Sequence, residues 1–186
     1  MKLRSREDSS FFKSILSLFK RQEQEEAPLY IAIINRDTTA VAALLAAGAD
    51  PNATAKNGMT MLMYAAYMNE VEAARLLLDH GAEINATIRD GTTALHYTQE
   101  SLRGNIEVMR LLLERGANVD AATEDGYNAL VSAVVSPYKV NAVRILLQAG
   151  ADIHHQSDGR SVLQTALLFS RGKETEAISL LREAGA

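Results

Sequence analysis

Few side chains in this sequence could carry out chemistry. Cysteine is absent, so neither a disulfide nor a thiolate nucleophile can form. Histidine, the side chain that most readily moves protons or binds metals near neutral pH, occurs four times. The adjacent pair His154 and His155 would point in opposite directions on an extended segment, and no third ligand lies near them in the sequence. A metal site is therefore not favoured.

The motifs that accompany common enzymatic reactions are also missing. The sequence has no glycine-rich phosphate loop, HExxH zinc helix, EF-hand loop or Gly-x-Ser-x-Gly elbow. Residues 52–54 and 85–87 both read Asn-Ala-Thr and match the glycosylation pattern, but no secretory signal precedes them. We interpret both as turn residues. We expect no enzyme activity, no cofactor and no small-molecule substrate.

Composition and charge narrow the class of protein further. The chain has 186 residues, of which 47% are hydrophobic, which is enough for a continuous core. Residues 1–21 hold six Lys/Arg and two Asp/Glu, so this segment carries +4 and the rest of the −4 chain carries −8. An acidic body repels nucleic acid and is compatible with a basic partner surface. Because no run approaches the roughly 18 apolar residues that span a bilayer, we expect a cytoplasmic protein.

The strongest regularity is a Gly-Ala dipeptide that recurs every 33 to 35 residues. An apolar run at helical spacing precedes each copy, as Leu76-Leu77-Leu78 precedes Gly81. A glycine directly after a helix accepts the left-handed conformation that ends many helices. The pattern therefore predicts five helix ends, at Gly48, Gly81, Gly116, Gly150 and Gly185.

A second register lies between the Gly-Ala copies. Its dipeptides favour tight hairpin-like turns: Asn57-Gly58, Asp90-Gly91, Asp125-Gly126 and Asp158-Gly159. Two residues after each glycine comes a side chain whose oxygen can accept a bond from an unpaired helix amide: Thr60, Thr93, Asn128 and Ser161. Each unit is therefore predicted to run turn, short helix, loop, longer helix and Gly-Ala. A unit of this size cannot bury its apolar stripe alone, so neighbouring units must stack.

These residues resemble the ankyrin repeat, in which a turn glycine, Thr-Pro-Leu-His, an Ala pair, Leu-Leu-Leu and Gly-Ala-Asp-x-Asn-Ala follow in phase. The clearest copies run from Gly58 to Ala86 and from Gly91 to Asp120. The family's proline survives only at Pro28 and its histidine only at His96, for which the resemblance implies a structural hydrogen bond. The resemblance implies an all-α solenoid over residues 27–186, with repeats at about 27–57, 58–90, 91–125, 126–158 and 159–186.

Partners of proteins that resemble this one usually bind the concave side, which is formed by the hairpin tips and the exposed face of each first helix. Tyr and Arg dominate the energetics of such surfaces because they bury a large area and still form hydrogen bonds. The alternative for Tyr67, Met68 and Phe169 is packing between repeats. Carried over slot by slot, the resemblance predicts these partner-binding residues: Tyr67, Met68, Arg89, Arg103, Tyr127, Tyr138, Arg160 and Phe169.

The first 26 residues form a separate, basic extension. Residues 10–21 can form an amphipathic helix that gathers Phe11, Phe12 and Ile15 on one side, and residues 22–26 are a polar linker. A helix this short needs a cover. It could cap the exposed edge of the first repeat, or its flanking cations could attract it to a membrane surface or a partner. Glu23, Glu25 and Glu26 argue against the membrane.

The sequence thus predicts a protein–protein interaction module. We expect it to bind a partner protein through the concave face, as an inhibitor or adaptor. The alternative is a membrane-peripheral adaptor anchored by residues 10–21.

Overall fold

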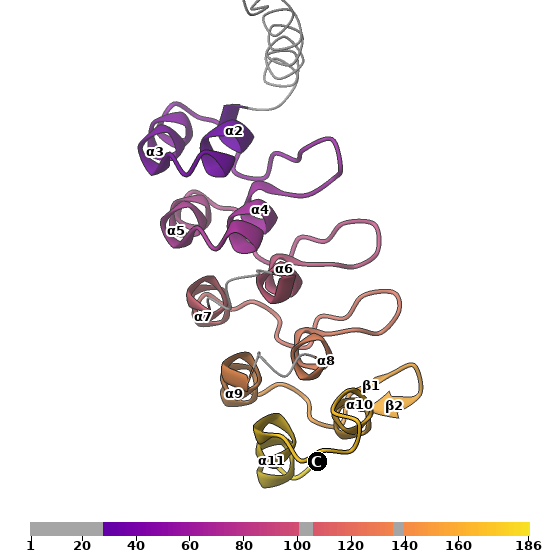
Figure 1. Cartoon of the computed structure of the whole chain (residues 1–186). Coiled ribbons are helices and arrows are strands. Elements are labelled where there is room, and N and C mark those ends of the chain that lie inside the picture. Colours follow the sequence, from indigo (N-terminus) through magenta and orange to yellow (C-terminus); the bar gives the residue numbers. More distant parts are fainter. Residues whose placement is uncertain (1–27, 101–105, 136–139) are drawn as a thin grey trace, which may run out of the picture.

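The computed structural model describes residues 28–100, 106–135 and 140–186. In these ranges, ten helices form five antiparallel pairs that stack in chain order, with a loop projecting from one side of the stack between successive pairs (Figure 1). Each helix packs against its own partner, and equivalent helices of successive pairs also pack together, as the first helices of the second and third pairs do. The predicted all-α solenoid of about five helical repeats is confirmed.

The first helices of the pairs, which we call the inner helices, form the column from which the loops project (Figure 1). They are α2 (Pro28–Ile34), α4 (Met61–Met68), α6 (Ala94–Glu100), α8 (Ala129–Val134) and α10 (Val162–Phe169). The second helices, which we call the outer helices, form the other column. They are α3 (Thr38–Ala46), α5 (Val71–Asp79), α7 (Glu107–Glu114), α9 (Val140–Gln148) and α11 (Glu176–Glu183).

The predicted helix boundaries depend on local hydrogen bonds that the structure contains. The side-chain oxygens of Thr60, Asn128 and Ser161 accept bonds from the backbone amides three residues later, at 3.2, 2.9 and 3.2 Å. Each of these bonds satisfies an amide that has no partner within the helix. At the other end, all five glycines of the Gly-Ala pairs have φ between +85° and +102°, as predicted.

The projecting loops are hairpins of two kinds, although the sequence predicted one kind of turn. In the first three, a single αL glycine follows the turn, as at Gly58, where the Gly58 amide donates to the Ala55 carbonyl at 2.8 Å. In the fourth, Asp158 and Gly159 both have positive φ, and they join the strands β1 (Gln156–Ser157) and β2 (Arg160–Ser161). Positive φ at both central residues is typical of a type I′ turn, whose backbone twist matches that of the flanking strands.

A single hydrophobic core runs through the whole stack. It contains fully buried residues from every pair, including Ile33, Leu62, Leu112, Leu146 and Ile178. Because each pair contributes one layer to this core, the stability of any repeat depends mainly on its neighbours.

A ladder of polar side chains joins successive repeats through the segments that follow the outer helices. The Asn52 Oδ1 accepts a bond from the Glu83 amide at 2.7 Å. The Asn85 Oδ1 does the same for the Asn118 amide at 2.8 Å, and Asp120 for Asp152 at 2.9 Å. The interpretation of residues 52 and 85 as turn residues was therefore incomplete, because both also bond to the next repeat.

Several predictions made from the sequence lie outside the described residues. They are the basic extension 1–26 with its amphipathic helix at 10–21, and the partner-binding residues Arg103 and Tyr138. Within the described ranges, no helix combines the length and apolar character that crossing a membrane requires.

One buried cap carries a group that its neighbours lack. The Asn128 side chain is fully buried, and its amide nitrogen has no hydrogen-bond partner among the described residues. Thr60 and Thr93 occupy the same slot with a single hydroxyl and no separate amide group. An unpartnered buried donor costs about 1–3 kcal/mol.

We predict that Asn128→Thr raises the free energy of unfolding by about 1 kcal/mol, because it keeps a cap oxygen and removes the unpartnered amide. Urea unfolding followed by circular dichroism measures the change. The reverse exchange, Thr60→Asn, is the matched control and should lower stability. A loss of stability in Asn128→Thr would show that the amide is satisfied in solution.

Candidate partner-binding face

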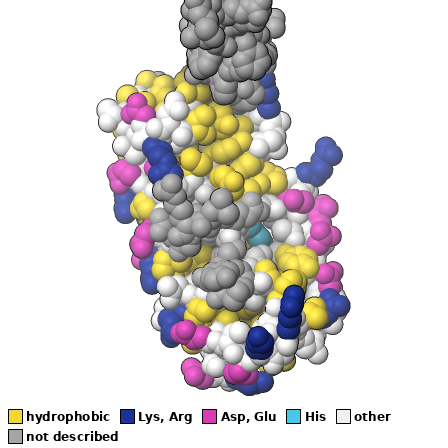
Figure 2. Space-filling model, viewed as in Figure 1, with side chains coloured by type: hydrophobic (Ala, Val, Ile, Leu, Met, Phe, Trp, Pro, Cys, Tyr) yellow, Lys and Arg dark blue, Asp and Glu magenta, His cyan; other side chains and the backbone are white. Residues whose placement is uncertain are grey.

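The large hydrophobic side chains that are exposed in the described residues share one structural position. They are Ile34, Tyr67, Leu168 and Phe169, with exposed fractions of 37%, 43%, 57% and 57%. Each is one of the last two residues of an inner helix. Figure 2 shows hydrophobic side chains gathered over α2 and α4, and again toward the α10 end of the stack beside Lys and Arg side chains. We call these helix ends, together with the hairpin tips, the inner face.

Tyr67, Met68 and Phe169 lie at this position, as their slots in the repeat require. Tyr67 packs edge-to-face on Tyr97 of the next repeat, with the ring centroids 6.5 Å apart, yet remains partly exposed. Met68 is half-buried. Tyr67 therefore packs on the neighbouring repeat, as the alternative considered from the sequence expects, and leaves part of its side chain accessible, so its role in partner binding stays a prediction.

Arg89, Tyr127 and Arg160 belong to the hairpins. Arg89 and Arg160 are exposed, and Tyr127 is half-buried. The Tyr127 hydroxyl donates to the Asp158 carboxylate on the next hairpin at 2.8 Å. This bond orients Tyr127 along the row of hairpin tips.

Two side chains on the hairpins have shifted pKa values. The hydrogen bond to Asp158, followed by the negative charge of that carboxylate, raises the pKa of Tyr127. The hydroxyl and the amide of Thr92 donate to Asp90 and lower the pKa of that carboxyl. Both shifts arise from bonds that order a hairpin.

Three of the four histidines have ring nitrogens within hydrogen-bonding distance of backbone carbonyls. The His96 Nδ1 lies 2.9 Å from the Thr93 hydroxyl, and its Nε2 lies 3.0 Å from the Tyr127 carbonyl of the next repeat. His155 Nε2 lies 2.7 Å from the Gly126 carbonyl. The structural hydrogen bond implied for His96 is present. Within the described residues, no three His, Asp or Glu side chains converge as metal ligands would.

Most ion pairs of the described residues lie on the outer column, although Arg36 after α2 also pairs with Glu70 at 3.2 Å. Four arginines on or directly after outer helices form ion pairs with carboxylates, Arg115 and Arg144 doing so with the adjacent repeat, each at 2.8 Å. For Arg89, Arg171 and Lys173, the described part of the chain supplies no ion pair. Arg171 and Lys173 therefore give uncompensated positive charge to the part of the inner face beside the end of α10, whereas the hairpin tips also carry the exposed acidic residues Asp90, Glu124 and Asp125.

Sequence reasoning missed Ile34 and Leu168. Both are apolar residues of apolar helices, and such residues read as core when only the helical period is considered. Their spacing within the repeat could have identified them. Each inner helix has a leucine near its start, at Leu29, Leu62 and Leu163 for example, and five residues after these lie Ile34, Tyr67 and Leu168.

A family model described as ankyrin repeats (3 copies) matches residues 4–88 and 86–157. No curated protein matches the chain. Repeats of this family are generally protein–protein interaction modules and are typically non-enzymatic.

We predict that Asp158→Asn lowers the pKa of Tyr127 toward its ordinary value, because the substitution removes the negative charge next to the phenol. Asn is chosen because it tolerates the positive φ of 52° at this position. Since the folded-state pKa is raised, the bond stabilises the protein below pH about 10 and this contribution is lost as the pH rises through the raised value. The loss of stability on raising the pH above about 10 should therefore be smaller in the variant.

Tyrosine-selective NMR titration measures this pKa, and Tyr127→Phe assigns the signal. If Asp158→Asn left the Tyr127 titration unchanged, the bond between the two hairpins would be absent in solution.

Proposed function

Because the chain belongs to the ankyrin-repeat family, we propose that it binds a partner protein through the inner face. The observation that carries this proposal is the shared position of Ile34, Tyr67, Leu168 and Phe169. Random surface variation would scatter exposed apolar side chains over both columns of helices. Their restriction to the ends of inner helices, within the described residues, is typical of an interaction surface.

Burial of these side chains would stabilise a complex. Removing apolar surface from water contributes about 25 cal/mol per Å². Aromatic residues such as Tyr67 and Phe169 contribute most at interfaces because their rings are large and lose few rotatable bonds on binding. The hairpin residues Arg89, Tyr127 and Arg160 add polar groups beside this apolar surface, which favours a defined orientation of the partner.

The scaffold favours binding with little conformational cost. Helix caps fix the start of the inner helices α4, α8 and α10, and the bonds from His96, Asn52 and Asn85 join neighbouring repeats. A surface held in its binding conformation loses less entropy when a partner binds. These features support a fixed platform rather than one that folds around its partner.

An inhibitor or adaptor role fits this arrangement better than catalysis. Three of the four histidines, His80, His96 and His155, have a ring nitrogen within hydrogen-bonding distance of a backbone carbonyl. The inner face instead provides accessible surface for contact with a partner. An inhibitor that covers a functional surface, or an adaptor that holds two proteins together, needs only such a contact surface. We further propose that this binding takes place in the cytoplasm, which the absence of cysteine favours.

We predict that Tyr67→Ala combined with Tyr127→Ala weakens partner binding by about 2 kcal/mol or more, because each substitution removes an aromatic anchor from the inner face. Affinity purification from the native cells identifies proteins captured by the unchanged chain and lost by the variant. Titration calorimetry with the purified partner then measures the affinity.

The matched control is Arg75→Ala combined with Arg110→Ala, which alters two exposed side chains of the outer helices α5 and α7. Circular dichroism establishes that both double variants are folded. A partner that bound both with the affinity of the unchanged chain would place the interface elsewhere.

A further inference from the structure

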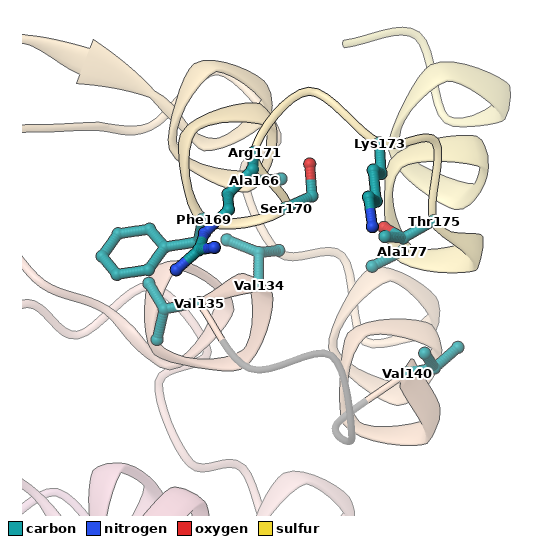
Figure 3. Close-up of a pocket in the computed structure, with 10 residues that line it drawn as sticks. All are labelled: Val134, Val135, Val140, Ala166, Phe169, Ser170, Arg171, Lys173, Thr175 and Ala177. Atoms are coloured by element: carbon teal, nitrogen blue, oxygen red, sulfur yellow. The ribbon is translucent and has the colours of Figure 1, made fainter.

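A pocket opens at the last repeat, where the inner face ends. Its volume is about 240 Å³. The apolar part of its wall comes from two neighbouring repeats, with Val134, Val140 and Ala166 among the lining residues. Figure 3 shows Phe169 and Arg171 on one side, above Val134 and Val135, and Lys173 on the opposite side. The pocket is thus apolar inside and basic at its edge.

The positive charge at this edge has no compensation from nearby carboxylates. Glu174 pairs with Arg182, and Glu176 pairs with Arg144, each at 2.8 Å. These are the acidic residues closest in sequence to Arg171 and Lys173, and both are already engaged. The residues between Val135 and Val140 contain no Asp or Glu. Arg171 and Lys173 are also exposed, so their charge is available to a ligand.

The size of the pocket decides between classes of ligand. Clefts that hold drug-sized molecules typically measure about 300–1,000 Å³ and enclose most of the ligand. This pocket is smaller, and the exposed side chain of Phe169 forms part of its wall. Such a shape suits one bulky apolar side chain whose main chain continues along the surface.

We propose that this end of the inner face binds an acidic protein segment. A bulky apolar side chain of the segment enters the pocket beside Phe169, and neighbouring Asp or Glu carboxylates pair with Arg171 and Lys173. The proposal rests on the inner face being the binding surface and adds the chemistry of the partner. It differs from the basic partner that the net charge of the chain favours, because the local charge at the pocket is opposite to that of the body.

Selection of short random peptides on the immobilised full-length chain tests this proposal. The expected result is enrichment of peptides that combine Leu, Ile, Phe or Trp with adjacent Asp or Glu. An enriched peptide is then synthesised, and its affinity is measured by fluorescence anisotropy at low and high salt. Binding should weaken as salt screens the charges.

Three variants locate the binding site. Arg171→Glu combined with Lys173→Glu should weaken binding on the order of tenfold, and Phe169→Ala should do so to a similar extent. The matched control, Arg75→Glu combined with Arg110→Glu, changes the net charge equally but on outer helices. It should alter the affinity by no more than about twofold, because a distant exposed charge is largely screened.

The outcomes separate this inference from the proposed function. Enrichment of basic or uncharged peptides, or of none, would overturn the inference. So would an acidic peptide whose affinity is unchanged in the Arg171/Lys173 variant. If such a peptide were instead lost on combining Tyr67→Ala with Tyr127→Ala, the inner face would remain the binding surface and only the pocket assignment would fail.

Discussion

The structure depends on the burial of an apolar stripe that no single repeat can cover. Residues such as Leu62, Leu112 and Leu146 are fully buried only because the helices before and after them are present. Hydrogen bonds between repeats fix the orientation of each repeat relative to the next. His96, Asn52 and Asp120 each reach a backbone group of the following repeat, so a rotated or shifted neighbour would lose the bond as well as the packing.

The ion pairs of the described residues lie mainly on the outer column of helices. Charged side chains of neighbouring outer helices form ion pairs, as Arg115 does with Asp79 and Arg144 does with Glu176. Surface pairs of this kind contribute little stability individually. Two ion pairs of the outer column engage Glu174 and Glu176, the carboxylates closest in sequence to Arg171 and Lys173, and these two cations form no ion pair with the described residues.

Much of the fold could be predicted from the sequence because it is encoded by local rules. A cap such as Thr60 and a glycine such as Gly81 each act on their own helix, so their types and spacing are sufficient. The hairpins were less predictable, because Gly91 is needed for two reasons. It has a positive φ, and a Cβ there would lie 3.1 Å from the Ala122 carbonyl oxygen of the next hairpin. The second reason requires knowledge of the neighbour.

The exposed residues of the inner face were predictable only in part, because their exposure also depends on the neighbouring repeat. The slots of Tyr67, Tyr127 and Phe169 follow from the repeat, but their exposure depends on how far the next repeat covers them. Tyr67 meets Tyr97, whereas Phe169 and Leu168 are left exposed where the stack ends. Because packed helices lie about 8–10 Å apart, equivalent slots recur at this interval. The slots differ in charge and exposure even though the helices repeat. A partner that lies along the stack must therefore present a different side chain to each slot.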